Sequence, residues 1–318
     1  MAKKQFVIGM DGGGTKTTAM LSDLKGNILV EQTGGPSNFQ IIGVERAAEV
    51  LFDLLERCRG EIGCSLDEVR SIVAGLTGAG READQERMRS GLEEYARRRR
   101  ETLRQIIIES DGRIALEGAF KGSVGIILIS GTGSIVFGKD QAGNVHRTGG
   151  WGRILGDEGS GYSIGRDALN AITKDLDGRG KSTLLTKLAA KQFGLSDQEK
   201  IITAVYRDNF DVALLAPLVI EAATVHDVEA SRILNKATFE LAEHVRALLN
   251  KLEKASRVRQ KIPLAFIGSV ISTDNVFTNI LRNKIIFSLP QISIVKPQAS
   301  PAYGAVLLAL RSLRNLHE

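Results

Sequence analysis

The first third of the chain alternates short apolar runs with one longer helical pattern. The short runs predict β-strands, the last two of them buried, in QFVIGM, TKTTAMLSD, ILVEQT, VRSIVAGL and LRQIIIES. VERAAEVLFDLLERC instead places apolar residues at helical spacing and predicts an amphipathic helix. A basic helix is expected after the glycine turn TGAG, and GRIALEGAF is expected to continue as a helix directly after Asp111.

The second half begins with the same layout as the first. GIILISGTGSIVFGKD predicts a strand, a turn of small residues and another strand, as FVIGMDGGGTKTTAMLSD does earlier. Related tails come next, DLKGNILVEQTGG at 23–35 and DQAGNVHRTGG at 140–150, which indicates an internal duplication. We therefore expect two lobes of related fold, 1–120 and 121–301, with a last helix at about 302–318 that packs on the first lobe.

From about residue 160 to 255 the pattern is mostly helical, most clearly in STLLTKLAAKQFG. IPLAFIGSVI then returns as a buried strand with a glycine turn, and a strand, a proline-marked loop and a final helix close the chain. Strands and helices that alternate in this order predict an α/β fold.

Composition narrows the classes of protein and partner. At 318 residues with 43% hydrophobic and 25% charged residues, the chain resembles soluble globular proteins. Its net charge of +5 is modest, and the densest basic run, Arg97 to Arg100, is expected on a solvated helix face, so no nucleic-acid partner is predicted. Asp11 interrupts the early apolar run and no apolar stretch of 18 residues comes after it, so we expect a cytoplasmic protein without a membrane partner.

The two cysteines, Cys58 and Cys64, are too few for a disulfide framework or a four-ligand zinc site. They are predicted to be ordinary thiols.

Three consecutive glycines, Gly12, Gly13 and Gly14, separate the first two predicted strands. Without a Cβ the backbone turns tightly and its N–H groups can approach an anion. Thr15 and Lys16 add further donors just beyond the glycines. The turn therefore predicts a phosphate site.

The residues after the glycines distinguish the kind of phosphate loop. In P-loop and dinucleotide-binding folds the turn leads into a helix, whereas here β-branched Thr17 and Thr18 and a period of two predict a hairpin between strands. GKST at 180–183 imitates the end of a P-loop motif, but no buried strand precedes it. We interpret it as a loop and a helix start, with Ser182 as a candidate N-cap.

Three glycine turns in this order, each beside a buried strand, resemble the sugar kinase, Hsp70 and actin superfamily. In that resemblance DGGGTKT is the first phosphate motif, SGTGS at 130–134 the second, and FIGSV at 266–270 the adenosine motif. The resemblance implies two ribonuclease-H-like α/β lobes with a nucleotide and sugar cleft between them.

A more specific segment is TGGWGRILGDEGSGYSIGRDAL, residues 148–169. It resembles the N-acetylglucosamine kinase branch of the BadF/BadG/BcrA/BcrD-type ATPases, and the similarity, which includes PSN at 36–38, runs over nearly the whole chain. A loop of glycines, one tryptophan and two acids suits a sugar, because carboxylates accept pyranose hydroxyls and an aromatic side chain covers the ring. The alternatives are a packing role for Trp151 and helix capping for Asp157 and Glu158.

The resemblance implies an ATP-dependent kinase that phosphorylates the 6-hydroxyl of N-acetylglucosamine. It makes Asp111 the base, at the end of a buried strand where side chains project into the crevice of an α/β sheet. The alternative is that Asp111 caps the next helix. Asp11 is implied to hold Mg²⁺, through water.

Further contacts are implied by the same motifs. The implied ATP and phosphate contacts are Gly12, Gly13, Gly14, Thr15, Lys16, Gly131, Thr132, Gly133, Gly268 and Ser269. The implied sugar contacts are Asn38, Asp111, Ser134, Gly150, Trp151, Gly152 and Asp157. Members of the family commonly form dimers, so a homodimer is expected.

Other functions stay open at this point. The sugar could be glucosamine or N-acetylmuramate, which differ from N-acetylglucosamine at C2 or C3. An ATPase activator of an acyl-CoA reductase is a second class, but such activators hold a [4Fe–4S] cluster through cysteines near the phosphate turns, and LISGTGS and its surroundings have none. We therefore expect neither an iron–sulfur cluster nor zinc. A non-enzymatic ATP-dependent assembly protein would fit the turns but not the loop of glycines, tryptophan and acids.

Overall fold

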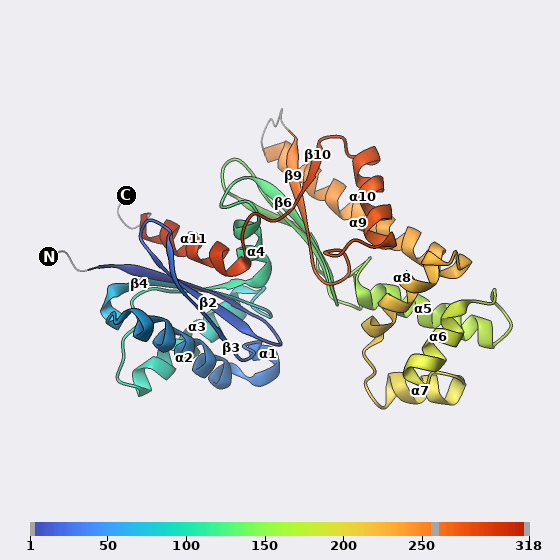
Figure 1. Cartoon of the computed structure of the whole chain (residues 1–318), viewed down its shortest axis with the longest axis horizontal. Helices are drawn as coiled ribbons and strands as arrows, with labels where there is room; N and C mark the ends of the chain where they lie inside the picture. Colours follow the sequence, from blue (N-terminus) through green and yellow to red (C-terminus); the bar gives the residue numbers. More distant parts are fainter. Residues whose placement is uncertain (1–3, 256–260, 315–318) are drawn as a thin grey trace. The chain divides into compact units, whose positions relative to one another are not determined.

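The computed structural model describes residues 4–255 and 261–314. The chain divides into two compact units, which Figure 1 shows coloured along the sequence. Unit 1 consists of Met1–Ser123 and Pro297–Glu318, and unit 2 consists of Val124–Lys296. Each unit contains one five-stranded sheet. The last four residues of the predicted C-terminal helix, 315–318, lie outside the described residues.

The sheet of unit 1 has the strand order β3-β2-β1-β4-β5. Its strands are β1 (Phe6–Gly12), β2 (Thr17–Asp23), β3 (Ile28–Gly34), β4 (Val69–Leu76) and β5 (Ile106–Ser110). The first three strands are antiparallel, whereas β4 pairs in parallel with both β1 and β5. Its helices are α1 (Phe39–Ile42), α2 (Val44–Ile62), α3 (Glu82–Arg98), α4 (Asp111–Ala119) and α11 (Pro301–Arg314), with a 3-10 turn, η1, at Leu66–Glu68.

The alternation of side chains along β1 assigns the helices to the two faces of this sheet. Phe6, Ile8 and Met10 are buried in one cluster with residues of α2 and α3. Val7 points to the other face and is buried with residues of α4 and α11. Figure 1 shows the same three layers, with α11 and α2 on opposite faces of the sheet. The strand pattern read from the sequence thus positions both helical layers.

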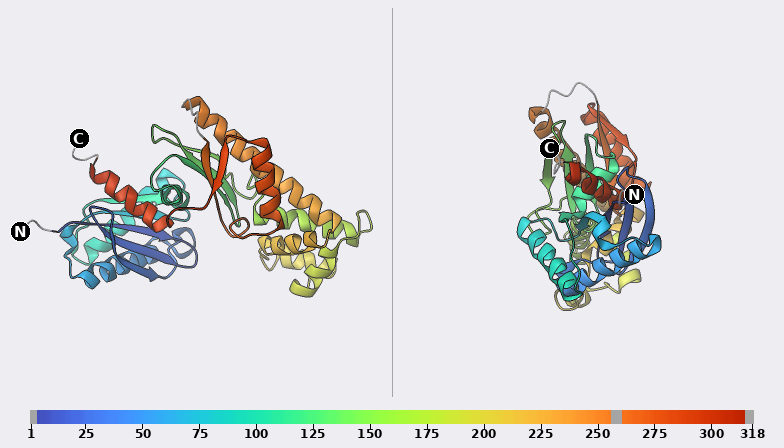
Figure 2. Two further views of the ribbon diagram at one scale, coloured as in Figure 1. Left: turned by 45° about the horizontal axis from the view of Figure 1, so that its top comes forward. Right: turned by 90° about the vertical axis from the view of Figure 1, so that its left-hand side faces the viewer.

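The sheet of unit 2 has the corresponding order β10-β9-β6-β7-β8. Its strands are β6 (Gly125–Ser130), β7 (Ser134–Lys139), β8 (Val145–Gly149), β9 (Ile262–Ile267) and β10 (Ile292–Val295). Its helical elements are α5 (Gly161–Leu176), α6 (Leu184–Phe193), α7 (Gln198–Tyr206), η2 (Val212–Leu215), α8 (Ala216–Thr224), α9 (Val228–Ala255) and α10 (Val276–Ser288). Figure 2 shows α9 along the sheet of this unit. None of the helices in the described ranges is long and apolar enough to cross a membrane.

The expected duplication is visible in the turns that close the second strand of each unit. In unit 1 the Asn27 N–H donates to Asp23 Oδ1 over 2.9 Å, and in unit 2 the Asn144 N–H donates to Asp140 Oδ1 over the same distance. In each turn the asparagine amide nitrogen also donates to the other carboxylate oxygen. The repeated Asp-x-x-Gly-Asn sequence therefore forms the same side-chain-locked turn twice, at equivalent places in two sheets of equivalent strand order.

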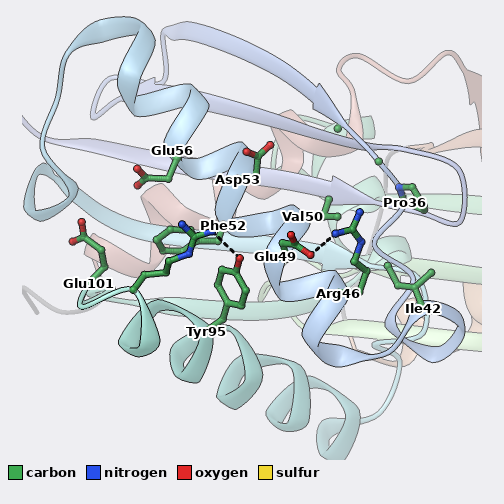
Figure 3. Close-up of a pocket in the computed structure, with 13 residues that line it drawn as sticks. Pro36, Ile42, Arg46, Glu49, Val50, Phe52, Asp53, Glu56, Tyr95 and Glu101 are labelled. Carbon is green, nitrogen blue, oxygen red and sulfur yellow. Dashed lines mark hydrogen bonds and ion pairs between the residues drawn. The ribbon is translucent and has the colours of Figure 1, made fainter.

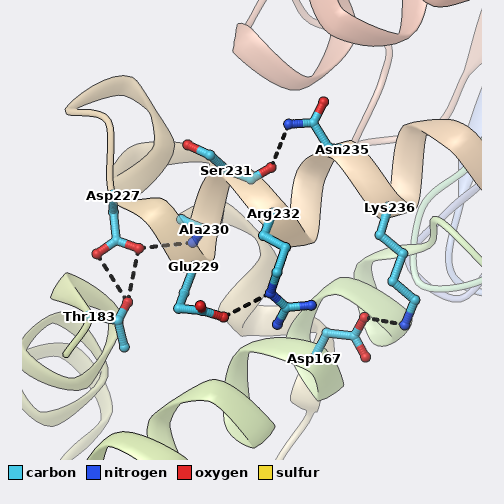
Figure 4. A network of polar contacts seen from close by, with 9 residues as sticks. All are labelled: Asp167, Thr183, Asp227, Glu229, Ala230, Ser231, Arg232, Asn235 and Lys236. Atoms are coloured by element: carbon cyan, nitrogen blue, oxygen red, sulfur yellow. Dashed lines mark hydrogen bonds and ion pairs between the residues drawn. The ribbon is translucent and has the colours of Figure 1, made fainter. Parts of the chain in front are cut away.

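The GKST sequence leads into α6, as expected, but the predicted N-cap is wrong. Thr183, not Ser182, is the N-cap, and its hydroxyl accepts from the Leu185 N–H. Thr183 is selected because Asp227 holds it: the Thr183 hydroxyl donates to Asp227 Oδ1 over 3.0 Å, and the Leu184 N–H donates to Oδ2 over 2.7 Å. Figure 4 shows this carboxylate directed at Thr183. Ser182 is exposed.

Candidate active site

The first glycine turn is a hairpin, as predicted. β1 and β2 are antiparallel, and the Gly13 N–H donates to the Lys16 carbonyl over 3.0 Å across the turn. A side chain at Gly12 would collide with the Ser37 hydroxyl, so glycine is required there for close packing. Thr15 and Lys16 are exposed at the tip. The glycine backbone and the side-chain donors of Thr15 and Lys16 therefore belong to one exposed loop.

The PSN segment is fixed on this turn by main-chain hydrogen bonds. The Gly13 carbonyl accepts from the Ser37 N–H (3.0 Å) and from the Asn38 N–H (3.2 Å). Asn38 Oδ1 in turn accepts from the Gln40 N–H and caps α1. A predicted sugar contact, Asn38, thus lies directly beside the predicted phosphate turn, although 24 positions separate Gly14 and Asn38.

Asp111 lies where β5 ends and α4 begins, as the sequence predicted. The helix cap is its neighbour Ser110, whose hydroxyl accepts from the Arg113 N–H over 3.1 Å, so the N-cap role considered for Asp111 is wrong. The Asp111 carboxylate accepts from the Gly112 N–H at Oδ1 (2.7 Å) and from the Thr77 hydroxyl at Oδ2 (2.8 Å). This carboxylate is half-buried and held at both oxygens.

Asp11 is a half-buried carboxylate whose ionisation is affected by the charge of Asp111. Burial raises the pKa of Asp11 to about 6, and the negative charge of Asp111 adds to this rise, while Lys16 opposes it. Asp11 and Asp111 thus lie at one edge of the sheet, close enough for the charge of Asp111 to disfavour ionisation of Asp11. Within the described ranges, no group of three or more His, Cys, Asp or Glu side chains is arranged to hold a metal ion.

In unit 2, the second glycine turn is enclosed by main-chain hydrogen bonds. The Gly131 N–H donates to the Gly133 carbonyl over 3.0 Å within the turn. The N–H groups of Gly161 and Tyr162, in the first turn of α5, donate to the carbonyls of Gly131 and Thr132. The second predicted phosphate motif therefore packs against the start of the helix that comes after the sugar-type loop.

The third glycine turn lies beside the second. Gly268 has φ +105°, and a side chain there would strike the Ser130 carbonyl, so only glycine fits. The Val270 N–H donates to the same carbonyl over 3.1 Å. The predicted phosphate residues Gly131 and Thr132 and the predicted adenosine residue Ser269 line one cavity of about 420 Å³.

The remaining wall of this cavity was missed by the sequence reasoning. It includes apolar residues of η2, α8 and the third turn, among them Ala213, Leu214, Pro217, Ile220 and Val270, and the polar residues Asp211, Thr273 and Asn275. An apolar wall beside two glycine turns suits a flat heterocycle next to a phosphate chain. The apolar run VALLAPLVI is visible in the sequence, but its pattern does not distinguish a segment that lines a ligand cavity from an ordinary buried helix.

The sugar-type loop is folded around Asp157, which has φ +57°. Its carboxylate accepts from the N–H groups of Ser134 and Gly152, and burial raises its pKa. The Ser134 hydroxyl donates to the Glu158 carbonyl over 2.7 Å, and the Gly150 N–H donates to the Ser134 carbonyl over 3.0 Å. Four predicted sugar residues of this unit are therefore brought together beside the second glycine turn.

The two acids do not take the helix-capping role considered for them, and Trp151 does not take the core role. Ser160 caps α5 through its hydroxyl, so Asp157 and Glu158 are not the helix cap. Trp151 is 66% exposed in this structure, with the Arg147 guanidinium 5.6 Å from its ring centroid, so it is not a core residue of unit 2.

Arg153 extends the polar surface next to Asp157. A cavity of about 360 Å³ is lined by Thr132, Gly133, Asp157 and Arg153, together with Tyr162 and residues 209–212. The Arg153 guanidinium lies 5.7 Å from the Tyr162 ring centroid. A cationic group thus accompanies the second phosphate turn, which the sequence could not assign.

A separate cavity of about 660 Å³ lies in unit 1 between the loop at Gly34–Pro36, α2 and α3 (Figure 3). Its charged side chains are largely paired: Arg46 binds Glu49, and Arg99 donates to the Tyr95 hydroxyl over 3.1 Å. Asp11, Asn38 and Asp111 are not among its lining residues. We therefore assign it no part in the candidate site.

The two cysteines are buried in the core of unit 1. Burial raises the pKa of the Cys58 thiol to about 12 and also raises that of Cys64. Neither cysteine belongs to a glycine turn, because Cys58 lies in α2 and Cys64 comes just after that helix. This placement differs from that of the cluster cysteines of the activators, which lie near the phosphate turns.

Comparison with known proteins identifies relatives over the full length. The profile of the BadF/BadG/BcrA/BcrD ATPase family matches residues 8–309. An N-acetylmuramic acid/N-acetylglucosamine kinase of Clostridium acetobutylicum is 36% identical over 96% of this chain and 98% of that protein. An N-acetyl-D-glucosamine kinase of Dictyostelium discoideum is 31% identical over 97% and 99%. A solved structure from Chromobacterium violaceum, that of a candidate N-acetylglucosamine kinase, has a TM-score of 0.71 at 27% identity and covers 96% of this chain and 99% of its own.

Proposed function

This chain belongs to the BadF/BadG/BcrA/BcrD ATPase family, and we propose that it is an ATP-dependent amino-sugar kinase that phosphorylates the 6-hydroxyl of N-acetylglucosamine. The predicted two-sheet α/β fold of the sugar kinases is confirmed. The observation that carries the proposal is the placement of the Asp111 carboxylate at the same sheet edge as the first glycine turn. A homodimer and a cytoplasmic location stay predictions.

We assign ATP to the glycine turns and to the cavity of about 420 Å³ in unit 2. The apolar wall at Ala213, Leu214 and Pro217 would cover the adenine, and Ser269 would contact the adenosine. Backbone N–H groups of the Gly12–Gly14 and Gly131–Gly133 turns other than those of Gly13 and Gly131, which donate within their turns, would bind phosphate oxygens together with Thr15, Lys16 and Thr132. Such donors stabilise the charge that spreads over the phosphoryl oxygens in the transition state.

In the proposed reaction Asp111 accepts the proton of the sugar hydroxyl. The hydroxyl oxygen forms a bond to the γ-phosphorus, the bond from that phosphorus to the β-phosphate oxygen breaks, and ADP leaves. Asn38, Ser134, Gly150, Trp151, Gly152 and Asp157 are the proposed sugar contacts. Ser134 has a buried hydroxyl that already donates to Glu158, so its side chain would act by holding the loop.

Mg²⁺ suits the chemistry at Asp11. Asp11 is half-buried, and both its burial and the charge of Asp111 disfavour its ionised form. A bound divalent cation would stabilise that ionised carboxylate. Magnesium uses few protein carboxylates and keeps water ligands, so Asp11 would hold it through one carboxylate or through water. When bound with ATP, the metal neutralises charge on the phosphates.

The test is ATP consumption by the purified protein with Mg²⁺ and one sugar at a time. The panel is N-acetylglucosamine, glucosamine, N-acetylmuramate, N-acetylmannosamine and glucose, with a control without sugar. We expect N-acetylglucosamine to raise turnover far above the control and its product to carry phosphate at C6. Equal turnover with every sugar and with none would reject the kinase, and a stronger response to another amino sugar would reassign the substrate.

The adenine assignment predicts the effect of filling the cavity of unit 2. Ala213→Phe should raise the KM for ATP about tenfold or more, because the new ring occupies the space assigned to the base, while the KM for the sugar changes little. Steady-state kinetics with each substrate varied measures both constants. Ala142→Phe, on an exposed turn of the same unit, is the matched control. An unchanged KM for ATP in Ala213→Phe would place the base elsewhere.

A further inference from the structure

Thr77 comes directly after the last residue of β4, the strand that lies between β1 and β5. The register aligns Gly12 of the phosphate turn with Leu76, and Leu76 with Ser110. Thr77, one residue beyond the end of β4, therefore lies between the first glycine turn and Asp111. The position of Thr77 is set by the pairing of three parallel strands and not by a local sequence motif.

Thr77 makes one hydrogen bond to each side of this junction. Its N–H donates to the Gly12 carbonyl over 2.9 Å, and its hydroxyl donates to Asp111 Oδ2 over 2.8 Å. A single residue thus connects the backbone of the predicted phosphate turn to the carboxylate proposed as the base. The two bonds are independent, because the first uses the backbone and the second uses only the side chain.

We infer that Thr77 is a positioning residue for phosphoryl transfer: its hydroxyl fixes the orientation of the Asp111 carboxylate relative to the phosphate turn. The inference rests on the proposed kinase function. The torsion that rotates an aspartate carboxylate is broad, so a donor at one oxygen is what selects a single orientation. The Gly112 N–H holds Oδ1 from the helix side, and Thr77 holds Oδ2 from the strand side.

This arrangement leaves the carboxylate able to react. Each carboxylate oxygen can accept two hydrogen bonds, so one bond at each oxygen leaves acceptor capacity for the sugar hydroxyl. Thr77 and Asp111 are both half-buried, so neither residue is fully enclosed in the core of unit 1. Displacement of a reacting group by about 1 Å can cost about a hundredfold in rate, and loss of the Thr77 hydroxyl allows a displacement of that kind.

Thr77→Val tests the inference because it keeps the backbone N–H and nearly the same shape and removes only the hydroxyl. We expect kcat for N-acetylglucosamine to fall about tenfold to a hundredfold, with the KM for ATP within about twofold of wild type. Thr77→Ser restores a donor and should recover kcat to within about threefold. Thr33→Val, on the edge strand β3, is the matched control and should behave as wild type.

The double variant Thr77→Val/Asp111→Asn distinguishes a positioning role of Thr77 from a merely structural one. If Thr77 acts through Asp111, Thr77→Val adds no further loss of kcat in that background, whereas independent effects would multiply.

Thr77→Ala, which also lacks the hydroxyl, is used in place of Thr77→Val if Thr77→Val does not fold. Wild-type kcat in the variant without the hydroxyl, failure of serine to rescue, or multiplicative losses would each overturn the inference. Absence of sugar-dependent turnover in the wild-type protein would instead reject the proposed function itself.

Discussion

Asp111→Asn is expected to lower kcat for sugar phosphorylation by about a hundredfold to ten-thousandfold, the range attributable to a general base. Asparagine has the same shape as aspartate and its carbonyl can accept one of the two hydrogen bonds that Asp111 receives from Gly112 and Thr77. It cannot accept a proton from the sugar hydroxyl. Because the proposed adenine and adenosine contacts lie in unit 2, ATP affinity should stay within about threefold.

Two measurements check this expectation. Steady-state kinetics gives kcat, and calorimetric titration with a non-hydrolysable ATP analogue gives the affinity. Asp53→Asn, which changes an exposed carboxylate on α2, controls for the loss of one charge. Turnover like that of the wild type would remove Asp111 from the mechanism, and loss of ATP affinity together with turnover would indicate a structural fault instead.

Asp11→Asn is expected to abolish most activity and yet to stabilise the ligand-free protein above pH 6. Burial and the charge of Asp111 raise the pKa of Asp11 from 3.8 to about 6. A raised pKa in an acid means that the folded state favours the protonated form, so this contribution to stability is fully present below pH 3.8 and is lost as the pH rises through about 6. Asparagine stays neutral and keeps that contribution at every pH.

Thermal unfolding in EDTA from pH 4 to pH 8 measures the difference. The rise of the pKa of Asp11 from 3.8 to about 6 corresponds to at most about 3 kcal/mol, so Asp11→Asn should raise Tm by several degrees at pH 8 and by little at pH 4. With Mg²⁺ and ATP present, the wild-type protein should gain more stability than the variant. A lower Tm for Asp11→Asn at pH 8, or equal stabilisation of both proteins by Mg²⁺ and ATP, would show that Asp11 has another role.

Several parts of the fold and the site could be read from the sequence because they depend on short-range pattern. Short apolar runs predicted β1 and β2, and the β-branched residues and the period of two after Gly14 predicted the hairpin between them. Repetition of Asp-x-x-Gly-Asn predicted two related units, and each copy forms its turn from contacts no more than four residues apart. The strand end before Asp111 identified the acid as a residue at the sheet edge.

The sequence by itself therefore determined most of the strands and helices, the glycine turns and the residue types available for phosphate and sugar chemistry. The tertiary structure alone decided which of them meet. The Thr77 to Asp111 hydrogen bond spans 34 positions, and Asp227 selects Thr183 as a helix cap from 44 positions away. The apolar wall of the nucleotide cavity likewise depends on η2 and α8 packing beside two distant turns. Such contacts are set by strand register and helix packing, which join residues far apart in the chain and leave no periodic signal in it.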